Sequence, residues 1–162
     1  MADVFSKAKR SAVMARIRAT GNKDTELRLM ALFRAHGITG WRRRQNLPGR
    51  PDFVFRQERL VIFVDGCFWH GCPKHFRAPK SRLTYWEPKI ARNRMRDRTV
   101  NRALKQLGWK VLRVWEHALS PRESGRTMAR LRRALAAGRT QRARPNTTAE
   151  IRRIRRERLL PR

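Results

Sequence analysis

Two short, largely apolar segments, Asp52–Phe55 and Leu60–Val64, are separated by only four residues, and this spacing constrains the fold more than any other feature. Both segments are rich in phenylalanine and valine, which favour strands. The intervening segment Arg56–Arg59 is short enough for a hairpin, so we expect two antiparallel strands side by side. The stiff turn Leu47–Pro51 leads into the first strand.

The segments around this hairpin predict two helices and a third strand. Apolar residues recur at helical spacing in residues 24–36, where Asp24 can cap the N-terminus. A long amphipathic helix is predicted for residues 86–107, and Gly108 is expected to end it. Residues 109–115 alternate in the manner of a strand. The order helix, strand, strand, helix, strand is typical of a mixed α/β fold in which helices flank a sheet.

The chain carries 41 lysine and arginine residues and only 12 acidic ones, a formal net charge of +29 in 162 residues. Such a chain attracts polyanions, and nucleic acid is the first candidate partner, ahead of an anionic membrane surface. No run of about 18 apolar residues could span a bilayer, and the N-terminus does not resemble a signal peptide. We therefore expect a cytoplasmic protein without a membrane partner.

Both ends of the chain are strongly basic. Residues 1–21 are predicted to form a basic arm at the start of a domain that spans residues 1–119. Residues 120–162 are predicted to be a basic extension, either helical at 130–137 and 150–160 or disordered until a polyanion binds.

The hairpin predicts that two carboxylates share one face of the sheet. If Phe55 pairs with Leu60, Asp52 lies opposite Phe63. Asp65 lies two residues further along the second strand, and because side chains alternate, Asp52 and Asp65 point to the same side. A diagonal spacing of about 7–8 Å would let both hold one Mg²⁺, which suits phosphodiester hydrolysis. The alternative is that both acids merely end their strands.

Two cysteines and nearby histidines predict a second metal site. Cys67 and Cys72 lie close together, His75 follows, and His117 comes just after the strand at the end of the α/β unit. Two thiolates and two imidazoles would complete a tetrahedral structural zinc site, and His70 could replace one of the ligands. The alternatives are free thiols with surface histidines, or a disulfide, which a reducing compartment disfavours.

Two further polar side chains are candidates for chemistry. His70, between the acids and the cysteines, could be a general base or a general acid, although a lone histidine is often structural. Glu26 falls on the apolar face of its predicted helix; it is either part of a site or an acid favoured near a helix N-terminus.

Three aromatic residues in this basic chain predict contact with bases. Phe68 and Trp69 are consecutive, and Trp86 could add a third ring. Projecting aromatic side chains stack on bases or wedge between base pairs. The alternative is that each belongs to the hydrophobic core.

Five segments within residues 1–119 resemble one family: Leu47–Phe53, Val64–His70, Tyr85–Ile90, Arg96–Arg98 and Gly108–Glu116. The order and content of these segments are similar to those of the very short patch repair (Vsr) DNA mismatch endonucleases. The resemblance does not extend over the C-terminal extension.

The resemblance implies a restriction-endonuclease-like fold of the PD-(D/E)XK type and a strand-specific nick 5′ of the thymine in a T:G mismatch. Such mismatches arise from deamination of 5-methylcytosine, and the nick initiates very short patch repair. The family implies Mg²⁺ for the chemistry and one structural zinc. We expect a monomer that acts on mismatched double-stranded DNA in the bacterial cytoplasm, associated with the nucleoid and helped by mismatch-repair accessory proteins.

The resemblance also implies roles for individual residues. Asp52 matches the essential metal-binding aspartate, Glu26 the acid of the first helix, and His70 the histidine beside the scissile phosphate. The residues that match the DNA-wedging aromatics are Phe68, Trp69 and Trp86. The residues expected to hold Mg²⁺ are Asp52, Asp65 and the backbone carbonyl of Val64, and those expected to hold zinc are Cys67, Cys72, His75 and His117.

The chain departs from the family at three of these positions. Asp65 stands where the best-known members carry a histidine, and resembles the second acid of the wider nuclease superfamily. Cys67 occupies the place of that superfamily's lysine, and His117 stands where a cysteine is usual.

Two other functions are compatible with the sequence. One is a Mg²⁺-dependent DNA endonuclease with another target, and the other is a non-catalytic zinc-containing DNA-binding module. The acids argue against the second, because Asp52 and Asp65 would repel phosphate unless a cation lay between them.

Overall fold

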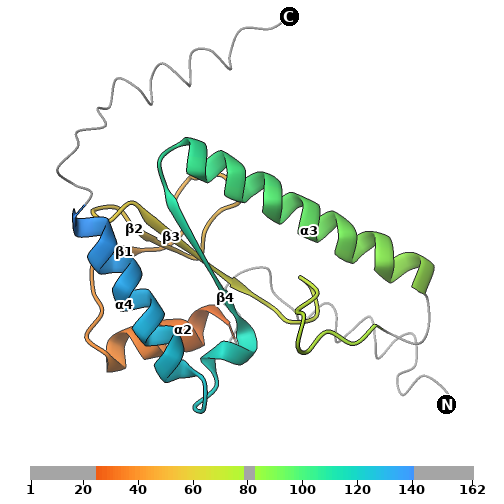
Figure 1. The fold of residues 1–162 in the computed structure, drawn as a ribbon, viewed down its shortest axis with the longest axis horizontal. Coiled ribbons are helices and arrows are strands. Elements are labelled where there is room, and N and C mark those ends of the chain that lie inside the picture. Colours follow the sequence, from red (N-terminus) through yellow and green to blue (C-terminus); the bar gives the residue numbers. More distant parts are fainter. Residues whose placement is uncertain (1–24, 79–82, 141–162) are drawn as a thin grey trace, which may run out of the picture.

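The computed structural model describes residues 25–78 and 83–140 (Figure 1). The expectations for an arm at residues 1–21, a cap at Asp24 and a helix at residues 150–160 lie outside the described residues. In chain order the elements are α2 (Glu26–Ala35), β1 (Trp41–Arg42), β2 (Phe53–Phe55), β3 (Leu60–Asp65), α3 (Leu83–Gln106), β4 (Lys110–Trp115), the 3₁₀ helix η1 (Glu116–Leu119) and α4 (Ser124–Thr140).

The four strands form one mixed sheet in the order β1-β2-β3-β4. The pairs β1–β2 and β2–β3 are antiparallel, whereas β3 and β4 are parallel. The predicted hairpin register is confirmed, because Phe55 pairs with Leu60. Helix α3 supplies the long crossover that parallel neighbours require. The predicted mixed α/β fold is therefore confirmed, with β1 as an additional strand that is too short to show an alternating pattern.

The sheet separates two hydrophobic clusters. Helices α2 and α4 cover one face and α3 covers the other (Figure 1). On the α2–α4 side, Phe33 is fully buried and contacts Phe53 and Phe55 with ring centroids 5.0 and 5.8 Å apart. On the α3 side, Val61 and Leu104 are also fully buried. Because side chains alternate, Phe63 and Asp65 face α3 together with Val61.

Helix α4 belongs to the core, although it lies within the predicted C-terminal extension. Met128, Leu131 and Leu135 are buried in the cluster on the α2 side of the sheet. The helix begins earlier than the one predicted at residues 130–137. Only a narrow apolar stripe of α4 faces the sheet, so the segment looked poor in core residues. The hydrophobic core therefore continues beyond residue 119.

The C-terminal end of helix α3 is held by contacts with the turn between β2 and β3. The chain leaves the helix at Gly108, as predicted, with a φ of 76° that glycine adopts readily. The Arg59 guanidinium, in the β2–β3 turn, donates a hydrogen bond to the Gly108 carbonyl at 3.1 Å. Among the residues that the structure describes, no helix has the length and apolar character needed to cross a membrane.

Candidate active site and metal centre

Asp52 lies where β2 begins, against the backbone of β3. The Val64 N–H donates a hydrogen bond to Asp52 Oδ2 at 2.7 Å. In a strand the N–H and the carbonyl of one residue point to the same side. The Val64 carbonyl therefore faces the side of β3 on which the Asp52 carboxylate lies, which places two oxygen donors at the end of the hairpin.

The surroundings of Asp52 favour its neutral form. Burial raises the pKa of Asp52 to about 7; the hydrogen bond from Val64 opposes this rise, while the charges of Glu26 and Asp65 and a hydrogen bond with Glu26 add to it. Glu26 is itself buried and forms an ion pair with Arg43. A cation bound here would reverse the electrostatic penalty on Asp52. A hollow of about 430 Å³, lined in part by Glu26, Arg43 and Asp52, gives solvent access.

Asp65 points to the α3 side of the sheet, where it is paired with an arginine. Arg113 Nε donates to Asp65 Oδ2 at 2.6 Å, and Arg113 Nη2 donates to Asp65 Oδ1 at 2.7 Å. Asp65 is near enough to Asp52 to raise the pKa of Asp52. Since both Asp65 oxygens already accept from Arg113, ligation of magnesium by Asp65 stays a prediction.

His70 is paired with an acid from α3. His70 Nδ1 lies 2.6 Å from Asp97 Oδ2 and 3.8 Å from Asp65 Oδ1. Burial alone would raise the pKa of Asp97, but the hydrogen bonds and charges of His70 and Arg113 outweigh it and lower the pKa overall. Asp97 therefore stays ionised and engages the Nδ1 side of the imidazole, which leaves Nε2 for other partners. His70, Asp97 and Arg113 line a cleft of about 380 Å³.

Sequence reasoning missed the roles of Asp97 and Arg113. Asp97 fell on the inner stripe of the predicted long helix, within the Arg96–Arg98 segment, and an acid on that stripe was a usable signal. Arg113 lies between Val111 and Trp115 on the strand face that turns toward α3, where an apolar residue is expected. An arginine at such a position requires an acidic partner.

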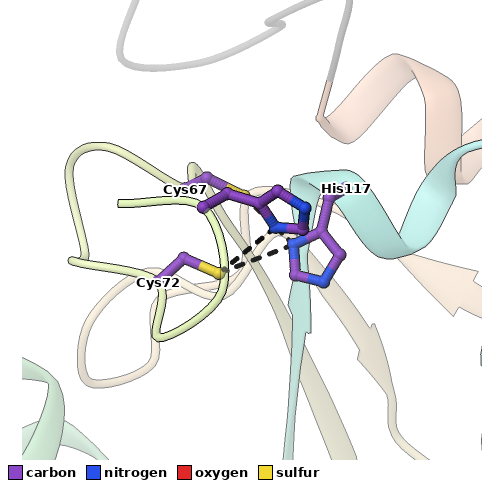
Figure 2. A group of neighbouring side chains, drawn as sticks. Cys67, Cys72 and His117 are labelled. Carbon is purple, nitrogen blue, oxygen red and sulfur yellow. Dashed lines mark hydrogen bonds between the residues drawn. The ribbon is translucent and has the colours of Figure 1, made fainter. Parts of the chain in front are cut away.

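The predicted cysteine–histidine cluster forms. Its potential ligand atoms, from Cys67, Cys72, His75 and His117, all lie within 4.8 Å of one another. His117 Nδ1 is 3.2 Å from the Cys67 sulfur and 3.6 Å from the Cys72 sulfur, and His75 Nδ1 is 3.8 Å from the Cys72 sulfur. Figure 2 shows the Cys72 sulfur directed at the imidazole of His117. Tetrahedral zinc would separate such ligands by about 3.3–3.8 Å, so this group could hold a metal ion.

The surroundings of Cys67 favour its neutral thiol. Burial raises the pKa of Cys67 to about 11, a hydrogen bond with the His117 backbone opposes the rise, and the neighbouring Cys72 adds to it. Two adjacent thiolates are therefore unfavourable unless a positive ion lies between them. The Cys67 N–H donates to Glu116 Oε2 at 3.1 Å, which ties the loop after β3 to η1 beside His117.

The three predicted DNA-contacting aromatics lie together. The Phe68 ring centroid is 5.3 Å from that of Trp69 and 5.0 Å from that of Trp86, which belongs to α3. All three side chains are half-buried and belong to neither hydrophobic cluster of the sheet. Lys89 Nζ lies 5.6 Å from the ring centroids of both Trp69 and Trp86. The structure thus forms a partly exposed aromatic group beside a cation, next to the cleft that His70 lines.

The acids, the histidine and the basic composition indicate a DNA endonuclease. Known proteins that are similar in sequence to this chain belong to the same class. A family model described as "DNA mismatch endonuclease Vsr" matches residues 2–76. The DNA mismatch endonuclease Vsr of Escherichia coli (strain K12) is 46% identical over 126 residues, which cover 76% of this chain and 79% of that protein. The chain belongs to the Vsr family.

Two relatives described as type II nicking enzymes extend this similarity. V.XorIIP of Xanthomonas oryzae pv. oryzae is 43% identical over 136 residues, which cover 83% of this chain and 98% of the relative. V.NaeI of Lentzea aerocolonigenes is 43% identical over 118 residues, which cover 68% of this chain and 69% of the relative.

Proposed function

We propose that this protein is a Mg²⁺-dependent endonuclease that nicks DNA 5′ of the thymine in T:G mismatches left by deamination of 5-methylcytosine. The nick would initiate very short patch repair. The observation that carries the proposal is the pairing of a half-buried carboxylate, Asp52, with the Val64 peptide at the end of the hairpin. Membership of the Vsr family supports it, and so does the match of Asp52 to the metal-binding aspartate of that family.

Asp52 and the Val64 carbonyl are the proposed magnesium ligands, and Glu26 adds negative charge beside them. Oxygen donors of this kind suit Mg²⁺, which keeps several waters and binds substrate phosphate. When bound, the ion would polarise the scissile phosphate as a Lewis acid. The chain's own contribution is to hold Asp52 in place through the Val64 N–H and to supply a hollow that the ion and its waters could occupy.

His70 is the proposed proton-transfer residue. Asp97 engages Nδ1 and orients the ring, so Nε2 is the atom that would accept a proton from the attacking water or donate one to the leaving oxygen. The arrangement follows the general rule that a third group orients a catalytic base.

The cysteine–histidine cluster is proposed to hold a structural zinc. The donor set of two sulfurs and two imidazoles is typical of closed tetrahedral sites. Such a site would fix the loop after β3 against η1 and so keep the aromatic group and His70 in place.

The aromatic group of Phe68, Trp69 and Trp86 is proposed to wedge into the duplex beside the mismatch. A mismatch already weakens stacking and pairing, which lowers the cost of opening the helix. Basic side chains supply sequence-independent, salt-sensitive affinity. Action as a monomer on nucleoid DNA in the cytoplasm, with mismatch-repair accessory proteins, is part of the same proposal.

The test uses end-labelled duplexes that each carry one T:G mismatch in varied contexts, beside matched duplexes, with Mg²⁺. A nick 5′ of the mismatched thymine alone is expected, and Asp52→Asn should abolish it while binding is kept. Equal cleavage of matched duplex would favour an endonuclease with another target. Tight binding without cleavage in any context would favour a zinc-containing binding module.

A further inference from the structure

Arg113 is the most heavily engaged charged side chain near the cleft. It lies on β4 in register with Phe63, and its guanidinium carbon is 4.7 Å from the Phe63 ring centroid. Its three nitrogens all donate to side-chain oxygens: Nε and Nη2 to Asp65, Nη2 also to Asp97 at 2.8 Å, and Nη1 to Asn101 at 3.1 Å. A guanidinium with this many fixed donors has little freedom to turn toward another partner.

The ion pair with Arg113 limits which other groups Asp65 can bind. The Asp65 side chain is only 6% exposed, and its two oxygens accept in the fork geometry that makes arginine–carboxylate pairs directional. A metal ion at Asp65 would stand next to the Arg113 charge, and the two cations would repel each other. Asp65 therefore differs from Asp52, which has a backbone N–H and another acid as neighbours and, among the described residues, no ion pair with a basic side chain.

Arg113 is also connected to the His70 imidazole through Asp97. Asp97 uses Oδ1 to accept from Arg113 and Oδ2 to engage His70 Nδ1. The chain of contacts Asp65–Arg113–Asp97–His70 thus joins β3, β4, α3 and the loop after β3. A carboxylate oxygen 2.6 Å from Nδ1 can only accept when it is ionised, so the Asp97 contact favours a hydrogen atom on Nδ1.

We propose that Arg113 is a positioning residue for the nicking reaction, and that Asp65 is its counter-ion and not a magnesium ligand. Arg113 fixes Asp97, and Asp97 fixes the ring and tautomer of His70. This inference rests on the proposed function for its kinetic consequences but not for its structural ones.

The kinetic test compares Arg113→Met, Arg113→Lys and Asp65→Asn in nicking of an intact T:G duplex. Arg113→Met should lower kcat by about 100-fold without changing KM for DNA or the magnesium concentration that gives half the maximal rate. Arg113→Lys keeps the charge but loses the fork, so its loss should be smaller. Asp65→Asn should leave the magnesium requirement unchanged, and its loss should not add to that of Arg113→Met.

Two kinetic outcomes would overturn the proposal. If Asp65→Asn raises the magnesium concentration needed for half the maximal rate, Asp65 is a metal ligand. If Arg113→Met lowers that concentration, the arginine competes with a metal for Asp65. Circular dichroism must show that each variant is folded. If Arg113→Met unfolds, Arg113→Lys is compared with the wild type in its place.

A structural readout separates this proposal from the proposed function. Nitrogen-15 NMR of magnesium-free protein, recorded where the imidazole is neutral, should show His70 protonated on Nδ1 in the wild type and a mixture of tautomers in Arg113→Met. Arg98→Met removes a charge from the same cleft and should leave the tautomer unchanged. An unaltered tautomer in Arg113→Met would refute the positioning role. A wild-type protein that shows the expected tautomer but nicks no duplex would refute only the proposed function.

Discussion

Replacing Asp52 with asparagine should stabilise the magnesium-free protein while it removes activity. Burial, with the neighbouring acid Glu26, raises the pKa of Asp52 to about 7. At neutral and higher pH the fold therefore holds an ionised carboxylate where it favours a neutral group. Asparagine keeps the shape of the side chain, and its carbonyl oxygen can still accept the hydrogen bond from the Val64 N–H.

The size of the stabilisation follows from the difference between the pKa of Asp52 in the folded and in the unfolded protein. The ordinary pKa of an aspartate is 3.8, and the pKa of Asp52 in the folded protein is about 7. At about 1.4 kcal/mol per pH unit, this difference corresponds to a penalty of roughly 4 kcal/mol for the ionised carboxylate in the folded state. Partial exposure to solvent reduces the expected gain to about 2 kcal/mol. Below pH 3.8 both states are protonated and the charge has no effect. The penalty grows as the pH rises toward about 7 and is constant above it.

The assay is urea unfolding of the wild type and Asp52→Asn at a series of pH values, in magnesium-free buffer that retains zinc. The gain in free energy of unfolding should increase with pH. Asp97→Asn is the matched control of opposite sign, because the fold lowers the pKa of Asp97. It should destabilise the protein at neutral pH, and the loss should shrink as the pH falls through the folded pKa. An Asp52→Asn protein no more stable than the wild type at about pH 8 would refute the reasoning.

Three further outcomes are expected. Metal analysis should find about one zinc ion per chain, and its removal should lower the thermal midpoint; protein that is stable and metal-free would contradict the zinc assignment. Phe33→Ala should cost about 3–5 kcal/mol in urea unfolding, because the ring is fully buried between α2 and the sheet; a loss below about 1 kcal/mol would contradict this packing. Trp86→Ala should slow nicking of a T:G duplex more than it weakens binding to matched duplex, measured by kinetics and equilibrium titration, because the ring belongs to the aromatic group; equal losses would count against a wedge.

The hairpin and the cysteine–histidine cluster could be predicted because their signals are local. A four-residue separation between two strands allows few registers, and the predicted pairing of Phe55 with Leu60 is confirmed. The predicted convergence of Asp52 and Asp65 on one cation stays a prediction. The Cys67–His75 segment contains three of the four candidate ligands within one loop. Assigning His117 to the cluster required only the assumption that β4 lies next to β3, which the structure confirms.

The features that could not be predicted depend on contacts between distant segments. Asp97 and Arg113 acquire their roles only when α3 crosses the sheet, and neither helical nor strand periodicity shows which acid meets which base. The buried stripe of α4 was hidden by the arginines that surround it. Strand β1 is fixed mainly by packing of Trp41 against Phe33 and Phe53, not by its own sequence pattern.

Phe68, Trp69 and His70 are consecutive residues of one loop, so their proposed roles in recognition and in chemistry would be coupled through the same short stretch of backbone. Any displacement of the two rings on entering a duplex must be transmitted to the imidazole through the same few peptide units. A perfectly paired duplex that resists entry would leave His70 out of alignment even while it is held by charge. Discrimination between damaged and intact DNA would then occur at the catalytic step rather than in binding.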